Sequence, residues 1–120
     1  MATVAELEKK AASETIEDVH ERYGIEFGDL ASALGVDRRT VLRYRNRRSV
    51  PRREVRSRLG KLREMSFLLS RVFDSPEDGL AWLFNPVPAL RGRTPMEVIR
   101  EGQVEAVVDL LAGIEGGVHY

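Results

Sequence analysis

The amino-acid sequence predicts an all-α fold, and three observations support that prediction. Apolar residues recur at spacings of three and four along most of the 120 residues, which is the period of one helix face. No segment alternates between apolar and polar side chains over five residues, as a half-buried strand requires. Serine, threonine or aspartate precedes several of the apolar runs, and these residues cap the amino ends of helices.

The N-terminal half contains four expected helices. Thr3 and Glu6 match a capping box, which places the start of the first helix. Asp37 is a good N-cap for the third helix. The expected helices lie at about 4–23, 27–34, 37–47 and 52–73, with a glycine after each of the first two.

Two pairs, Ser75-Pro76 and Thr94-Pro95, predict helix starts in the C-terminal half, because the first residue caps a helix and proline fits its first position. Segment 85–92 contains two prolines and a glycine, so we expect an ordered loop and not a helix. The last helices are expected at about 95–101 and 103–114, before Gly116-Gly117. We predict two domains, 1–58 and 59–120, divided within the helix 52–73.

Composition excludes several classes of site. The chain has no cysteine and only two histidines, far apart at His20 and His119, so we expect neither a disulfide nor a metal site. It has no nucleophile motif, glycine-rich phosphate loop or i, i+4 histidine pair, so we expect no enzymatic activity and no cofactor. No apolar run is long enough to cross a membrane, and the N-terminus lacks a signal region. We therefore expect a cytoplasmic protein without a membrane partner.

The charged residues are segregated along the chain, although the net charge is zero. Residues 1–36 carry three basic and eight acidic side chains, a net charge of −5. Residues 37–63 carry twelve basic and two acidic side chains, a net charge of +10, and residues 64–120 return to −5. A basic block of this size indicates a polyanionic partner. The alternative is an arginine-rich helix that is merely solvated.

Residues 27–46 have the spacing of a helix-turn-helix. Ala31 lies where two helices would cross, and Gly35 lies where the turn requires a positive φ. Five apolar residues supply the wedge that sets the angle between the helices: Leu30, Leu34, Val36, Val41 and Tyr44. The segment resembles the helix-turn-helix of phage-repressor-like regulators, so we expect the polyanion to be DNA.

The outward face of the second helix of this motif is the candidate DNA-binding site. Its amino-terminal part would enter the major groove, where Arg suits guanine, Asn suits adenine and Leu contacts a thymine methyl. Other arginines are better placed for phosphates, namely Arg45, Arg47, Arg48, Arg52, Arg53 and Arg56. The predicted DNA-binding residues are Arg38, Arg39, Thr40, Leu42, Arg43, Asn46, Arg47 and Arg48.

The C-terminal half leaves three possibilities open from its residues alone: a dimerisation bundle, a ligand pocket, or a docking module for another protein. Its apolar residues from Val104 to Ile114 have plain helical spacing, which is typical of a core. Trp82 fits either a core position or an interface anchor.

A family resemblance distinguishes among these possibilities. The order Trp82-Leu83, Asn85-Pro86, Ala89-Leu90, Gly92, Thr94-Pro95-Met96-Glu97-Val98-Ile99, Gly102, Val107-Val108, Leu111, Ile114 and Gly116 resembles the toxin-binding domain of Xre/MbcA/ParS-type antitoxins. The resemblance covers about residues 75–120, and with the helix-turn-helix it spans about 27–120.

The resemblance implies a function and its partners. Such antitoxins bind a RES-domain toxin that degrades NAD⁺ and occlude its active site with their C-terminal segment, here about residues 114–120. They also repress their own operon by binding operator DNA, often as a homodimer. The toxin-binding residues that it implies are Trp82, Asn85, Pro86, Leu90, Thr94, Pro95, Gly116, Gly117, Val118, His119 and Tyr120.

Two other interpretations remain at this stage. The chain could be a stand-alone transcriptional regulator whose C-terminal half only dimerises, or an adaptor whose helix-turn-helix has lost DNA binding. The acidic N-terminal 23 residues are also more than a minimal motif needs. They could form an additional dimer helix, or mask the basic block when DNA is absent.

Overall fold

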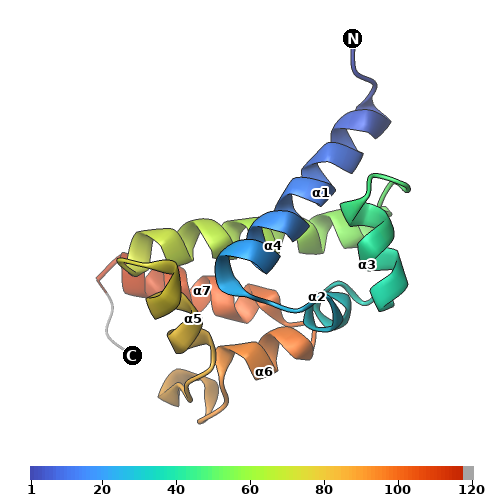
Figure 1. The fold of residues 1–120 in the computed structure, drawn as a ribbon. Helices are drawn as coiled ribbons and strands as arrows, with labels where there is room; N and C mark the ends of the chain where they lie inside the picture. Colours follow the sequence, from blue (N-terminus) through green and yellow to red (C-terminus); the bar gives the residue numbers. More distant parts are fainter. Residues whose placement is uncertain (118–120) are drawn as a thin grey trace.

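The computed structural model describes residues 1–117, and every regular element in that range is helical, so the all-α prediction is confirmed. Figure 1 shows α1 and α3 at one end of the molecule and α5 with the carboxyl end of α7 at the other. The elements are α1 (Val4–Tyr23), α2 (Phe27–Leu34), α3 (Arg38–Arg45), α4 (Arg53–Val72), α5 (Pro76–Leu83), the 3₁₀ turn η1 (Pro88–Leu90), α6 (Pro95–Arg100) and α7 (Val104–Glu115).

Helix α1 begins and ends where its capping residues predict. The Thr3 hydroxyl accepts a hydrogen bond from the Glu6 backbone N–H at 3.1 Å. This bond gives an acceptor to one of the N–H groups that the first turn leaves unpaired. Gly24 ends the helix with a φ of 64°. The inward face of α1, which includes Ile16, Val19 and Tyr23, is fully buried, so this helix is an integral part of the fold.

Helices α2 and α3 are joined by a tight turn that requires Gly35. This residue has a φ of 70°, and a Cβ there would also collide with the Arg58 guanidinium, whose Nη1 donates to the Leu34 carbonyl at 2.9 Å. The Asp37 side chain accepts from the Thr40 N–H at 2.8 Å and caps α3. The positive φ of Gly35 was predicted from the spacing, whereas the lack of room for a Cβ is due to Arg58 on α4.

The carboxyl end of α3 corrects the prediction that this helix reaches Arg47. Helix α3 ends at Arg45, and Arg47 has a positive φ of 58°. The N–H of Arg48 donates to the Arg43 carbonyl at 2.8 Å, and that of Arg47 donates to the Tyr44 carbonyl at 3.0 Å. These two bonds form a Schellman motif, which usually has glycine at the left-handed position. An arginine therefore occupies a strained backbone position here.

The long helix α4 is the centre of the structure. It packs against α7 over much of its length, and also against α1, α2 and α5. Met65 and Leu62 have no exposed surface, and buried residues from α1 through α7 form one apolar cluster. The division at residues 58 and 59 falls inside α4, and the two-domain description stays a prediction.

The C-terminal helices begin at the predicted Ser-Pro and Thr-Pro pairs. The Ser75 side chain accepts from the Asp78 N–H at 3.1 Å. Thr94 and Glu97 form a complete capping box, with bonds of 3.0 and 3.3 Å. Segment 85–92 differs from the prediction of a loop without helix, because Pro88–Leu90 form a 3₁₀ turn. Its prolines fit such a turn, since a single 3₁₀ turn requires few N–H donors.

Candidate functional site

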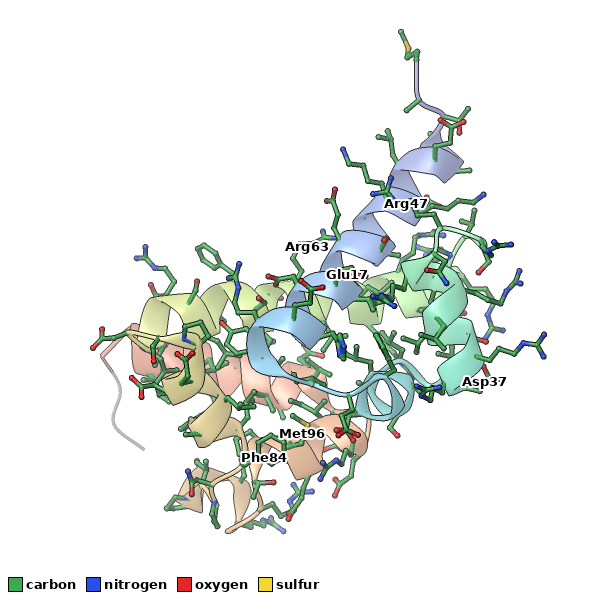
Figure 2. All side chains as sticks on the ribbon, viewed as in Figure 1. Glu17, Asp37, Arg47, Arg63, Phe84 and Met96 are labelled. Atoms are coloured by element: carbon green, nitrogen blue, oxygen red, sulfur yellow. The ribbon has the colours of Figure 1, made fainter. Side chains whose placement is uncertain are left out.

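The predicted DNA-binding residues lie on one surface, formed by the outward side of α3 and the turn after it. The side chains of Arg38, Arg39, Arg43, Asn46, Arg47 and Arg48 are exposed, while Thr40 and Leu42 are half-buried. Figure 2 shows Asp37 and Arg47 near opposite ends of α3. We call these eight residues the basic face. Val41 and Tyr44, on the other side of α3, are buried in the core.

Carboxylates of α1 pair with two of the arginines that were expected to contact phosphates. Arg45 forms an ion pair with Glu17, and the Arg56 guanidinium lies 3.5 Å from Glu8. The bond from Arg45 holds the pKa of Glu17 below its usual value. Within residues 1–117, none of the arginines of the basic face has such a carboxylate partner. The acidic helix α1 therefore neutralises Arg45 and Arg56, which lie beside the basic face, and leaves the arginines of the basic face without a carboxylate partner among residues 1–117.

A small aromatic cluster, which the sequence did not predict, lies beside the first residue of the basic face. The rings of His20 and Phe27 stack with centroids 4.0 Å apart. The guanidinium groups of Arg38 and Arg45 lie 5.9 and 5.2 Å from the Phe27 ring, within the range of cation–π attraction. Phe27 thus helps to position one arginine of the basic face, and its place at the start of a helix gave no sign of this role.

The predicted toxin-binding residues of the C-terminal half divide into inward and outward groups. Leu90 and Pro95 are buried, and Thr94 is occupied as the N-cap of α6. Asn85 is exposed, but its amide donates to the Ala81 carbonyl at 2.6 Å and closes α5. The outward group is Pro86, Gly116 and Gly117, all exposed. The structure therefore gives Leu90, Asn85, Thr94 and Pro95 folding roles, and their contact with a toxin stays a prediction.

Trp82 is half-buried, with its ring centroid 5.8 Å from that of Phe73. The neighbouring Phe84 is 48% exposed and lies under the Arg100 guanidinium, 5.8 Å from the ring centroid. Arg100 also binds both carboxylate oxygens of Asp29 on α2, at 2.8 and 3.4 Å. This ion pair joins residues 71 positions apart, a separation at which no sequence period predicts a contact.

The end of the described chain lies beyond α7. Gly116 and Gly117 are exposed, and Gly117 has a φ of 90°. The predicted residues Val118, His119 and Tyr120 lie outside the described residues. Among residues 1–117, no three His, Asp or Glu side chains lie close enough together to hold a metal ion. No helix in this range combines the length and apolar character that crossing a membrane requires.

Residues 68–117 match the family described as the antitoxin Xre/MbcA/ParS C-terminal toxin-binding domain. The mycobacterial cidal antitoxin MbcA of Mycobacterium tuberculosis, and that of Mycobacterium bovis, are 26% identical over 104 residues, which cover 87% of this chain and 91% of each relative. The fold also resembles a chain of the crystal structure of the M. tuberculosis MbcT–MbcA toxin–antitoxin complex, with a TM-score of 0.69, 25% identity, and 90% and 96% of the two chains covered.

Proposed function

We propose that this chain, an antitoxin of the Xre/MbcA/ParS type, inhibits a RES-domain toxin that degrades NAD⁺ and represses its own operon by binding operator DNA. One observation carries the proposal. The free arginines of the basic face lie at one end of the molecule, and the carboxyl end of the toxin-binding family match lies at the other. The two surfaces are far enough apart for DNA and a toxin to be bound together, in a molecule 45 Å long.

The proposed DNA interface is the basic face. A helix-turn-helix places the amino end of its second helix in the major groove, and in this chain that end carries Arg38 and Arg39, both exposed. Arg43 and Asn46 follow on the same exposed side and are suited to guanine and adenine edges. If six to eight phosphates are contacted, the slope of log K against log salt concentration is about −5 to −7.

The proposed inhibitory element is the C-terminal segment after α7. Gly116 and Gly117 let the chain leave the helix in a direction that a bulkier residue would restrict. The residues that follow offer an apolar, an imidazole and an aromatic side chain. In this proposal, residues 68–115 provide the docking surface and the segment after them occludes the active site.

Co-expression with the neighbouring reading frame tests the proposal. The neighbour is expressed alone and then with this chain, and growth and cellular NAD⁺ are recorded. Arrested growth with loss of NAD⁺, both restored by this chain, is the expected result. A neighbour that is harmless and forms no complex would contradict the toxin-binding role. The remaining account would then be a DNA-binding regulator with a C-terminal dimerisation core.

Deletion of residues 116–120 separates docking from occlusion. The shortened chain should still co-purify with the toxin, because α4 to α7 are intact, but it should no longer protect cellular NAD⁺. The control removes residues 1 and 2, which precede the Thr3 cap of α1 at the other terminus, and should leave protection unchanged. Undiminished protection by the chain lacking 116–120 would overturn the proposed occlusion while leaving toxin binding standing.

A further inference from the structure

Gly60 lies in the eighth position of the 20-residue helix α4, and no contact within the chain explains it. A Cβ at this position would meet nothing within 4 Å among the described residues. Glycine is among the residues that least favour a helix interior. The backbone of α4 is therefore open to close approach from outside the chain at this position.

Phe67 presents the complementary feature on the same side of the same helix. Its side chain is 61% exposed, which is the largest exposure of any aromatic side chain among residues 1–117. Residues seven positions apart lie on one face of a helix, within about 20° of each other. The outward side of α4 therefore carries a small open position and a large apolar side chain two turns later.

We propose that two copies of this chain pair through this side of α4, with the helices antiparallel and the two-fold axis between Arg63 and Glu64. This inference rests on the proposed function, which includes a homodimer, and it assigns the surface. In this arrangement Phe67 of each copy lies opposite Gly60 of the other. A two-fold interface uses the same patch twice, so one Phe and one Gly per chain suffice for two equivalent contacts.

The charges at the centre of the patch are also self-complementary. The axis places Arg63 of one copy opposite Glu64 of the other, twice. Arg63 donates to Thr15 through Nε and Nη2 at 3.3 and 3.2 Å, which leaves Nη1 available among the described contacts. The outer arginines of the patch, Arg56 and Arg71, would face each other, but each is already paired with a carboxylate of its own chain.

A hollow beside α4 gives the phenyl ring room. It has a volume of about 420 Å³, it is open to solvent, and its walls are Ala11, Glu14, Thr15, Asp18 and Arg63. Figure 2 shows Arg63 beside the middle of α1, where this hollow lies. Ala11 and the aliphatic part of Arg63 would contact the ring, because long charged side chains cover apolar groups with their stems.

The pairing also sets the separation between the amino ends of the two α4 helices. With a rise of about 1.5 Å per residue, the Arg53 residues of the two copies lie about 32 Å apart along the helices. That is close to one turn of duplex DNA, about 34 Å, the half-site separation that dimeric helix-turn-helix proteins read.

Two substitutions test the patch on the full-length chain by sedimentation equilibrium. Gly60→Gln should raise the dimer dissociation constant at least tenfold while raising Tm by about 3 °C, because glutamine favours a helix more than glycine does. Phe67→Ser should weaken the dimer similarly. The control Gly28→Gln changes a helical glycine of α2, outside the patch, that also has open space around it, and should leave the dimer unchanged. A monomer at all concentrations, or a dimer unaffected by Gly60→Gln and Phe67→Ser, would overturn the proposal.

A charge exchange tests the position of the axis. Glu64→Arg alone should weaken the dimer at least tenfold, and the double variant Arg63→Glu with Glu64→Arg should recover most of that loss. Glu64→Cys should form an intermolecular disulfide on oxidation, since the chain has no other cysteine, whereas Glu14→Cys on α1 should not. Failure of the double variant to recover would contradict this pairing. Toxin protection by Phe67→Ser is measured separately, so that a failed antitoxin role and a failed interface are told apart.

Discussion

The basic face on α3 and the family match at 68–117 differ in where their characteristic side chains point. On α3, Arg38, Arg39 and Arg43 are exposed, so these predicted DNA-binding residues are free to contact a partner. In the C-terminal region, Leu90 and Pro95 are buried and Thr94 caps a helix. The difference shows that the residues of a recognisable binding pattern can stabilise the fold beneath a surface without contacting the partner themselves.

The largest expected effect comes from removing packing that both regions share. Ile99→Ala should lower the free energy of unfolding by about 3 kcal/mol, since Ile99 is fully buried and the cavity cannot collapse completely. Because one apolar cluster extends from α1 to α7, the fluorescence of Trp82 and the far-ultraviolet circular dichroism should change in one urea transition. Two separated transitions would instead establish two independent domains.

The next effect should be confined to the basic face. Arg43→Ala should weaken binding to operator DNA by about 1–3 kcal/mol if its guanidinium contacts a base, and leave Tm unchanged because the side chain is exposed. Mobility-shift titrations measure both operator and random duplexes. Arg22→Ala, which removes an exposed arginine outside the basic block, is the control. An equal loss on both duplexes would reassign Arg43 to a phosphate.

Thr94→Ala tests whether a residue of the C-terminal family pattern has a folding role or contacts the toxin. Loss of the capping box should lower stability by about 1 kcal/mol, with toxin co-purification unchanged at temperatures where the variant is folded. Thr94→Ser keeps the hydroxyl and should behave like the wild type. Thermal unfolding and co-purification are the two measurements. If Thr94→Ala keeps full stability yet no longer binds toxin, Thr94 is a contact residue after all.

Arg47→Gly should affect stability and DNA binding in opposite directions. Glycine adopts the positive φ of 58° without strain, so the free energy of unfolding should rise by up to about 1 kcal/mol. Removal of a phosphate contact should reduce the salt slope of DNA binding by about 1. Arg48→Gly, without a positive φ, serves as the comparison and should give no stability gain. A loss of stability in Arg47→Gly would contradict the strained Schellman end.

The smallest effect concerns the N-cap of α3. Hydrogen bonds from Thr40 hold the pKa of Asp37 below its usual value. A lowered pKa in the folded state means that the ionised carboxylate stabilises the fold above its unfolded-state pKa, and that this stabilisation is lost as pH falls through the folded-state pKa. The Tm of wild type relative to Asp37→Asn should therefore fall as pH decreases from about 5 to 3. A constant difference between the two would contradict the role of the charge.

Much of the fold could be predicted because helix ends depend on neighbours in the sequence. The starts of α1, α3, α5 and α6 follow from Thr3, Asp37, Ser75 and Thr94, each of which bonds to an N–H three residues later. The end of α3 was predicted two residues too late, because nothing in the local sequence shows that Arg47 accepts a glycine's conformation. The 3₁₀ turn in 88–90 was missed, because its one proline, Pro88, is equally compatible with an irregular loop.

Three properties can be recognised from the amino-acid sequence: the chain is helical, its basic residues form one block, and its C-terminal half carries a toxin-binding family pattern. These properties follow from local bonds, helical period and composition. Which arginines of the block lack a carboxylate partner depends on the tertiary structure. Glu17 and Glu8, both on α1, pair with Arg45 and Arg56. The tertiary structure also decided that the pattern residues Leu90 and Pro95 face inward. Burial and ion pairing depend on how helices far apart in the chain pack together, and no local period encodes that packing.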